Sequence, residues 1–304
     1  MKILILGSSG FIGRNLDKKL SIDNDVLSLD KFNVSEESKI DIENFLQVKE
    51  VIYKFKPDVI INLAARTDLL GKKLDDYRVN WKGVKNIIQA IDEIKIKPLL
   101  IHFSSMLVCK MGYTPKSMSE FKPDTIYGES KVKSERVLID RSYNFPVFIL
   151  RPTTVWGYDA EKPYSTFINI VQSFGWLSLS IFSSKRDFCD IRVLVDVVSK
   201  IISSKDKLNR TFKGTYYISD QNRKSVNDLA KIVSKEKGGK VFESRMLDKF
   251  ITFFIKHLSY LGDLFLRYSV HFPLNSRRIK NMNTSTNLPV MELHDLLREI
   301  NSNT

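Results

Sequence analysis

The chain has 304 residues, of which 43% are hydrophobic and 27% are charged. These values are typical of folded globular proteins and exclude globally disordered, collagen-like and coiled-coil chains. The net charge of +13 is spread along the whole sequence instead of gathering in one arm, so no nucleic-acid partner is expected.

Apolar runs rich in β-branched residues alternate with stretches of helical period through the first half of the chain. The predicted strands are 2–6, 25–29, 58–63, 98–104 and 146–151, and the helices between them are 11–20, 43–55, 76–94 and 126–142. Continuously apolar strands separated by helices indicate a parallel sheet covered on both faces. The predicted fold class is therefore α/β, a doubly wound parallel sheet of the Rossmann type, with ligands at the carboxyl ends of its strands.

Beyond Gly157 this alternation gives way to loops and aromatic residues. A helix at 193–204, an isolated strand at 215–218 and an amphipathic helix at 225–236 are predicted there. We expect residues 1–155 to form a dinucleotide-binding domain, to which residues 186–218 return. Residues 156–185 and 219–304 are expected to form a smaller, carboxyl-terminal substrate-binding region.

The first strand runs directly into a glycine turn, Gly7-Ser-Ser-Gly10-Phe11-Ile12-Gly13, which opens the first helix. A strand, a glycine turn and a helix amino terminus allow backbone amides to approach a pyrophosphate. Asp30 ends the second strand, 17 residues after Gly13, where a carboxylate accepts hydrogen bonds from the adenosine ribose and repels a 2′-phosphate. We therefore expect NAD as the cofactor in preference to NADP, although the neighbouring cation Lys31 would favour NADP.

Two further segments are expected to line the same site. Asp41 and Ile42 would face the adenine, and Leu63, Ala64 and Ala65 follow the third strand. Small side chains there would let a cofactor lie close to the backbone. Tight packing between sheet and helix would equally explain the two alanines.

Tyr127 and Lys131 are separated by four residues in the segment Tyr-Gly-Glu-Ser-Lys, downstream of Ser104 and Ser105. On a helix, the phenol and the ammonium would share one face and could act on the same bound molecule. A tyrosine has an ordinary pKa of about 10, and a nearby cation lowers it, so we expect Lys131 to make Tyr127 more acidic. The pattern indicates nicotinamide redox chemistry.

Taken in their order along the chain, these motifs resemble those of the extended short-chain dehydrogenase/reductase family, specifically its NAD-dependent nucleotide-sugar epimerases and dehydratases. The matching segments are 7–13, 58–65, 103–109, 127–131, 151–157 and 186–188, together with Asn80, Gly83 and Asn86. The resemblance implies a Rossmann-type domain for NAD(P) and a carboxyl-terminal region for a nucleotide-diphosphate sugar.

The resemblance also implies the roles of individual residues. Ser105, Tyr127 and Lys131 match the catalytic set of the family, and Tyr127 and Lys131 would also contact the cofactor. Arg186, in the segment Arg-Asp-Phe, and Arg277, in the later segment 275–278, match arginines that bind the substrate diphosphate. Arg278 is the alternative to Arg277.

Departures from the family pattern limit which reactions the chain is expected to catalyse. Sugar 4,6-dehydratases follow the serine with Asp-Glu, where this chain has Met106-Leu107, and the catalytic cysteine of GDP-fucose synthases would fall on Leu107. We therefore expect NAD-dependent epimerisation of a nucleotide-diphosphate sugar at C4, through a transient 4-keto intermediate, in surface-polysaccharide sugar synthesis. The alternatives are an NAD(P)H-dependent nucleotide-sugar ketoreductase and, in another class, a non-catalytic dinucleotide-binding scaffold.

Residues 247–268 combine apolar residues at steps of three and four with Lys249, Lys256 and Arg267. We expect this stretch to pack in the core or in a dimer; a substrate lid and contact with an anionic membrane are the less favoured alternatives. The family resemblance also suggests a homodimer built from the helices at 76–94 and 126–142.

The two cysteines, Cys109 and Cys189, and the four scattered histidines show no metal-ligand spacing, so neither a disulfide nor a metal site is expected. The first strand begins directly after Met1, which leaves no room for a signal peptide. No apolar run approaches the roughly 20 residues needed to cross a bilayer. A cytoplasmic location is therefore expected.

Overall fold

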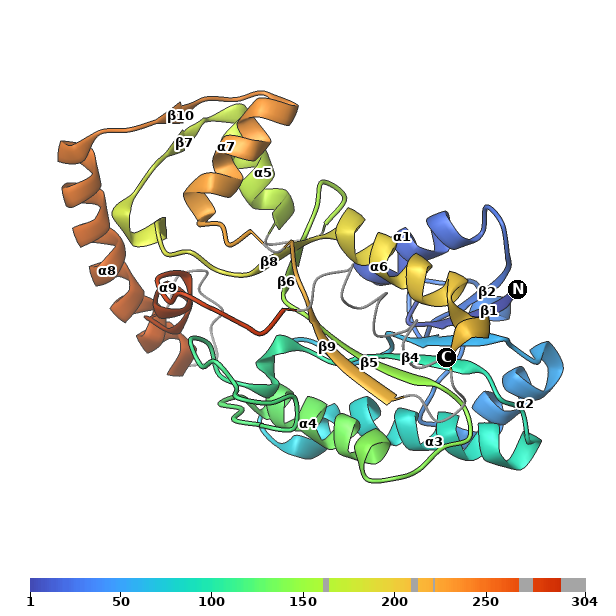
Figure 1. Cartoon of the computed structure of the whole chain (residues 1–304). Coiled ribbons are helices and arrows are strands. Elements are labelled where there is room, and N and C mark those ends of the chain that lie inside the picture. Colours follow the sequence, from blue (N-terminus) through green and yellow to red (C-terminus); the bar gives the residue numbers. More distant parts are fainter. Residues whose placement is uncertain (161–163, 209–212, 221, 268–275, 291–304) are drawn as a thin grey trace.

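The computed structural model of the chain describes residues 1–160, 164–208, 213–220, 222–267 and 276–290. At its centre lies a six-stranded parallel sheet in the order β2-β1-β3-β4-β5-β9 (Figure 1). Its strands are β1 (Lys2–Leu6), β2 (Asp25–Leu29), β3 (Val59–Asn62), β4 (Leu99–Phe103), β5 (Val147–Pro152) and β9 (Lys213–Ile218). The predicted doubly wound α/β fold is confirmed.

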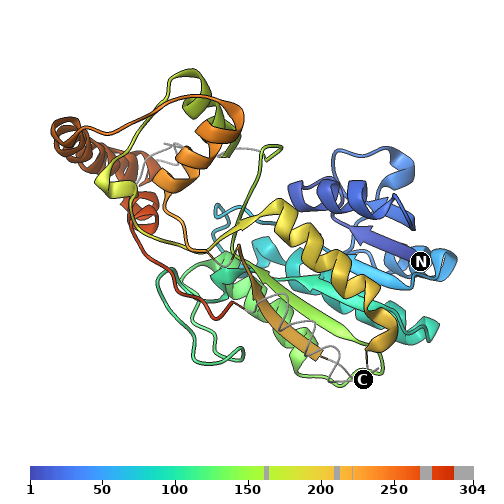
Figure 2. The ribbon, with the colours of Figure 1, turned by 45° about the horizontal axis from the view of Figure 1, so that its top comes forward.

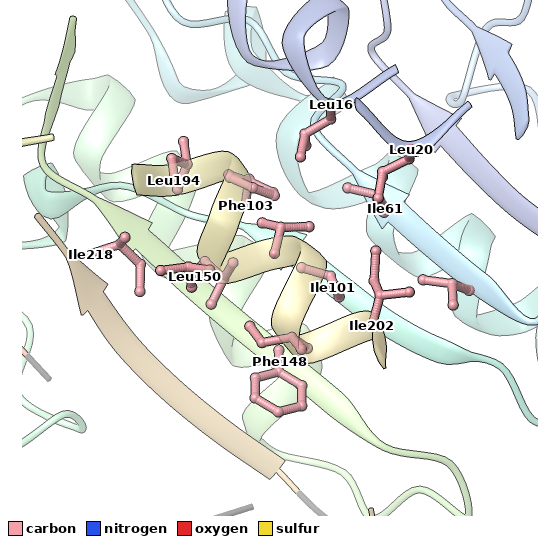
Figure 3. Packing of buried hydrophobic residues seen from close by; sticks show 14 of the residues in the cluster. Leu16, Leu20, Ile61, Ile101, Phe103, Phe148, Leu150, Leu194, Ile202 and Ile218 are labelled. Carbon is pink, nitrogen blue, oxygen red and sulfur yellow. The ribbon is translucent and has the colours of Figure 1, made fainter. Parts of the chain in front are cut away.

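Helices cover both faces of this sheet, which is why its central strands are continuously apolar. Helices α1 (Phe11–Leu20) and α6 (Ile191–Ser203) pack on one face, and α2 (Phe45–Phe55), α3 (Val79–Ile94) and α4 (Ile126–Ile139) on the other. Figure 3 shows the first of these layers, in which Leu194 and Ile202 of α6 lie over Phe148 and Leu150 of β5.

Local capping explains where the helices depart from the predicted bounds. Helix α2 begins at Phe45 and not at residue 43, because the side chain of Asn44 accepts hydrogen bonds from the first-turn amides of Leu46 and Gln47. Helix α3 begins at Val79 and not at residue 76, since a separate 3-10 helix, η2 (Leu74–Tyr77), precedes it.

The strand predicted at 215–218, within the segment expected to return to the dinucleotide-binding domain, is part of the main sheet. It extends over β9 and pairs in parallel with β5 along its whole length, from Val147 opposite Lys213 to Pro152 opposite Ile218. Helix α6 leads from the short strand β8 (Phe188–Asp190), which pairs with β6 (Thr154–Trp156), back to this edge of the sheet.

A smaller lobe stands beside the sheet, as Figures 1 and 2 both show. It consists of α5 (Tyr164–Ser173), β7 (Trp176–Leu177), α7 (Val226–Lys237), β10 (Val241–Phe242), α8 (Arg245–Arg267) and α9 (Ser276–Met282). The stretch predicted as amphipathic at 247–268 forms most of α8, and its last residue, Tyr268, lies outside the described residues. Helices α5 and α7 share an apolar core that includes Ile168 and Leu229.

Candidate active site

A glycine turn joins β1 to α1 at the point where the strand order of the sheet reverses, between β1 and β3. Gly7 has a φ of +90°, and a Cβ there would lie 2.6 Å from the backbone nitrogen of Ala64. A Cβ on Gly13 would collide with the carbonyl oxygen of Gly7, whereas a Cβ on Gly10 would lie 3.6 Å from that oxygen, an ordinary contact. The turn therefore requires glycine at 7 and 13, and leaves open space beside Gly10.

Helix α1 presents its amino terminus to this space. Gly10 is the N-cap residue and supplies no side-chain hydrogen bond, and the first turn of α1 contains no acidic residue. The first amides of a helix lack partners within the helix and carry partial positive charge. This end of α1 is therefore suited to an anionic group such as a pyrophosphate.

A cleft of about 950 Å³ opens at the turn, a size typical of ligand pockets. Its lining includes all residues predicted to contact the cofactor except Tyr127 and Lys131: Gly7, Gly10, Phe11, Ile12, Gly13, Asp30, Asp41, Ile42, Leu63, Ala64 and Ala65. Both the space beside Gly10 and the free helix terminus fit a dinucleotide.

The carboxylate of Asp30 ties the glycine turn to the end of β2. One of its oxygens accepts hydrogen bonds from the backbone N–H and the hydroxyl of Ser9, at 3.0 and 2.8 Å. The other accepts hydrogen bonds from the amides of Lys31 and Phe32, at 2.6 and 3.2 Å. The ammonium of Lys31 lies 2.7 Å from the carboxylate of Asp41, so this cation already has an anionic partner.

The three catalytic candidates lie at the carboxyl end of β4 and in the first turns of α4. Ser105 precedes the 3-10 helix η3 (Met106–Val108), and its hydroxyl accepts a hydrogen bond from the amide of Leu107 at 3.1 Å. Lys131 follows Tyr127 by one turn, and its ammonium donates a hydrogen bond to the carbonyl of Phe103 at 2.9 Å. Because β4 is next to β3 in the sheet, these side chains belong to the same edge as the cleft.

The start of α4 is set by Thr125, whose hydroxyl accepts a hydrogen bond from the amide of Gly128 at 2.8 Å. Gly128 itself packs closely, since a Cβ there would collide with the carbonyl oxygen of Leu107. The cap and this close approach together place Tyr127 in the first turn, against the loop that carries Ser105.

Burial dominates the pKa of Tyr127. The side chain is only 8% exposed, and its burial raises the pKa to about 12, against the opposing effect of the hydrogen bond with Ser105. Burial also lowers the pKa of Lys131 to about 8, and the charge of Glu135 partly offsets this shift. The prediction that Lys131 makes Tyr127 more acidic is therefore wrong, since burial outweighs any influence of the cation.

Buried polar residues hold α4 against the neighbouring helix and strands. Asn80 of α3 donates a hydrogen bond to the hydroxyl of Ser130 at 2.8 Å. The ring of His102 lies between the amide of Asn62, at 3.2 Å, and the hydroxyl of Ser134, at 3.1 Å. Sequence reasoning did not single out His102, because it sits inside an apolar run.

Among the lining residues that were not predicted, three come from later segments of the chain. Thr154 and Val155 belong to the segment 151–157, which the family resemblance had marked without assigning them a contact. Tyr164 begins α5 in the smaller lobe and stands in no recognised motif. Its position shows that the smaller lobe contributes to the wall of the cleft.

Arg186, predicted to bind the substrate, is a buried cation. Its side chain lies over the ring of Phe188, 4.8 Å from the centroid, and donates a hydrogen bond to the carbonyl of Asn281 at 3.2 Å. Within the described residues, its buried Nε has no hydrogen-bond partner and no carboxylate forms an ion pair with it. Burial lowers the pKa of Arg186, so an anionic ligand would stabilise its charge.

Arg277, the second predicted substrate residue, is exposed on α9. Its guanidinium lies 3.5 Å from the carboxylate of Asp124, so it has an anionic partner within the chain. Helix α9 does adjoin Arg186, through Asn281. The side chain of Arg278 lies outside the described part of the chain.

Known proteins resemble this chain along most of its length. The model of the family described as RmlD substrate binding domain matches residues 1–247. A dTDP-4-dehydrorhamnose reductase of Aggregatibacter actinomycetemcomitans is 31% identical over 213 residues, which cover 66% of this chain and 68% of the relative. A UDP-glucose 4-epimerase of Vibrio cholerae is 30% identical over 234 residues, 69% of each chain. The crystal structure of a dTDP-4-dehydrorhamnose reductase from Bacillus anthracis in complex with NADP has the same fold, with a TM-score of 0.65, 24% identity, and coverage of 80% of this chain and 82% of that one.

Proposed function

Since the chain belongs to the RmlD substrate binding domain family, within the extended short-chain dehydrogenases/reductases, we propose that it transfers hydride at a single carbon of a nucleotide-diphosphate sugar. The family consists of NAD(P)-dependent epimerases and reductases, which makes the chain an enzyme and leaves the scaffold alternative without support. The observation that carries the proposal is the buried phenol of Tyr127, whose pKa the neighbouring side chain of Ser105 lowers against burial, at the edge of the sheet that also holds the cleft.

Each residue of the site has a role in this chemistry. The nicotinamide cofactor, when bound in the cleft, supplies or accepts the hydride. Tyr127 would donate its proton to the carbonyl oxygen of a ketosugar, and Ser105 would hydrogen-bond to the same oxygen. Lys131 would hold the nicotinamide ribose.

The similarity to a dTDP-4-dehydrorhamnose reductase supports ketosugar reduction as the first candidate, which reverses the order expected from the sequence. Reduction needs Tyr127 only as a proton donor, and burial of the phenol favours its protonated form. Epimerisation is retained as the second candidate, supported by the similarity to the epimerase of Vibrio cholerae.

We place the substrate diphosphate at Arg186, because a buried guanidinium without a carboxylate partner gains most from a phosphate. The nucleotide sugar would then be held by residues 156–185 and 219–304, of which 161–163, 221, 268–275 and 291–304 lie outside the described residues. Arg277 could bind the substrate diphosphate only by breaking its ion pair with Asp124. This makes it the weaker of the two substrate-binding candidates.

The cofactor preference rests on Asp30. Its carboxylate stands where a 2′-phosphate would be repelled, and the cation beside it, Lys31, is paired with Asp41. We therefore propose NAD(H) as the preferred cofactor, while the similar structure from Bacillus anthracis holds NADP.

The test is to incubate the purified protein with UDP- and dTDP-linked 4-ketosugars and UDP-hexoses, each with NADH or NADPH. Loss of one reduced cofactor per sugar converted would identify a reductase. Conversion without net cofactor loss would identify the epimerase. Tyr127→Phe should keep cofactor binding and lower turnover by about 10²-fold or more. Tyr143→Phe, which removes another buried phenol near the end of α4, is the matched control; near-normal turnover in Tyr127→Phe would remove Tyr127 from the chemistry.

A further inference from the structure

Helix α8 is apolar on two sides. On its inner side, Ile251 and Ile255 pack against the cluster of the smaller lobe that contains Leu179 and Ile181. On its outer side stand five large side chains that are between 59% and 78% exposed, here called the α8 aromatic face: Met246, Phe250, Phe253, Phe254 and Tyr260. The core packing expected from the sequence thus accounts for the inner side only.

The α8 aromatic face forms one continuous surface. Its members follow each other at helical steps and therefore project on the same side. The rings of Phe250 and Phe254 lie 5.0 Å apart, and Phe253 lies 6.5 Å from Phe254 and 4.0 Å from His257. Figures 1 and 2 both place α8 at the outer edge of the smaller lobe.

The charges that border this face are positive. Arg245 and Lys249 are exposed in the row of side chains next to Met246 and Phe250, and no carboxylate among the described residues forms an ion pair with either. Asp248, the acid between them in sequence, lies toward the lobe, where it accepts hydrogen bonds from the amide and hydroxyl of Ser180 at 2.8 and 3.1 Å.

The second acid of the helix is also engaged. Asp263 accepts a hydrogen bond from the amide of Ser276 at 3.0 Å. The described outer side of α8 therefore combines aromatic rings with cations that form no ion pair, while both carboxylates of the helix accept hydrogen bonds from neighbouring segments. A second copy of this face would bring no carboxylate to those cations, whereas an anionic surface would complement them.

We propose that the α8 aromatic face docks on an anionic phospholipid membrane. Aromatic side chains favour the boundary between acyl chains and headgroups, and arginine or lysine beside them attracts anionic headgroups. None of the helices in the described residues is long and apolar enough to span a bilayer. Helix α8 would accordingly lie in the plane of the membrane surface. The proposal does not depend on which sugar the enzyme converts.

Flotation of the purified full-length chain with lipid vesicles tests this proposal. The wild type should float with vesicles of phosphatidylcholine and phosphatidylglycerol, and much less with phosphatidylcholine alone or in high salt. Phe250→Glu and Phe253→Glu should each weaken binding by about tenfold or more, because each removes one large apolar side chain from the interface. Lys249→Gln should weaken it by about fivefold.

Matched controls lie on the opposite part of the molecule. Leu46→Glu changes a leucine of α2 that is 72% exposed, and Lys18→Gln changes an exposed lysine of α1. Both should bind vesicles like the wild type. All these side chains are exposed, so every variant should keep the wild-type unfolding temperature.

Two results would overturn the proposal. One is a wild-type chain that stays unbound in the presence of anionic vesicles, or a Phe250→Glu variant that floats as well as the wild type. The other is a concentration-dependent dimer in light scattering that Phe250→Glu dissociates while vesicle binding is absent. That second result would assign the α8 aromatic face to a second copy of the chain.

Discussion

Glu135 of α4 and Arg151 of β5 form an ion pair in which both side chains are fully buried. The guanidinium donates two hydrogen bonds to the carboxylate, at 2.8 and 2.6 Å, and the hydroxyl of Ser104 donates a third. Glu135 follows Lys131 by one helical turn, and its charge raises the pKa of that lysine against the effect of burial. The pair therefore fixes the helix that carries Tyr127 and Lys131 to the neighbouring strand.

Glu135→Gln is expected to destabilise the protein strongly. The substitution leaves a buried guanidinium without its counter-charge, which typically costs about 3–5 kcal/mol. The free energy of unfolding, measured with denaturant, checks this. Glu50→Gln breaks an exposed ion pair with Lys54 and should change stability little. If the two substitutions lowered the free energy of unfolding equally, the buried pair would stabilise the protein no more than the exposed pair does.

Local patterns in the sequence predicted the strands and helices in the first half of the chain. They did not predict contacts between segments that are far apart in the sequence. The strands and the glycine turn are encoded by neighbouring residues, so periodicity and spacing found them. The pairing of β9 with β5 joins segments more than 60 residues apart and leaves no local trace. The exposed side of α8 was only a less favoured alternative for a related reason, because helical period shows that a face is apolar and not what covers it.

The electrostatics of the site illustrate the same limit. The spacing of Tyr127 and Lys131 correctly puts them on one helix, but it contains no information about burial. Burial determines both pKa values and moves each group toward its neutral form. The pairing of Arg277 with Asp124, 153 residues earlier in the chain, was equally invisible in the sequence.

Gly10→Ala and Gly13→Ala should separate cofactor binding from folding. A Cβ on Gly10 would meet only an ordinary contact, so the variant should keep its unfolding temperature. It would also fill the space where the pyrophosphate is expected, so cofactor affinity should fall by at least about tenfold. A Cβ on Gly13 would meet the Gly7 carbonyl and lie 2.7 Å from the Cα of Ser8, so Gly13→Ala should destabilise the protein. Titration with NADH and thermal unfolding measure the two effects. If Gly10→Ala kept the wild-type affinity for NADH, the pyrophosphate could not bind beside Gly10.

Asp30→Ala should weaken NADH binding more than NADPH binding. The substitution removes an acceptor for the ribose hydroxyls and also removes the negative charge that opposes a 2′-phosphate. Asp30→Asn is the control, since an amide oxygen can still accept one of the hydrogen bonds from Ser9. Fluorescence titration with both cofactors gives the ratio of affinities. If the affinities for NADH and NADPH fell equally, Asp30 would stabilise the glycine turn without contacting the adenosine ribose.

Lys131→Met should change the pH dependence of stability in a defined direction. The folded-state pKa of Lys131 is about 8, below its ordinary value of 10.5, so the unfolded chain binds more protons than the folded one between these pH values. The contribution of Lys131 to stability therefore rises with pH in that window, and below pH 8 the burial of its charge is fully unfavourable. Relative to the wild type, Lys131→Met should be most favoured at pH 7 and progressively less favoured toward pH 10.

Thermal unfolding of both proteins across this pH range measures the trend. Lys131→Met also loses the hydrogen bond from Lys131 to the carbonyl of Phe103, which lowers stability equally at every pH. The test is therefore how the stability difference between the two proteins changes with pH. Lys133→Met, at an exposed position of the same helix, should show no comparable slope. If the difference between Lys131→Met and the wild type stayed constant from pH 7 to pH 10, Lys131 would not be the buried, destabilised cation that the structure indicates.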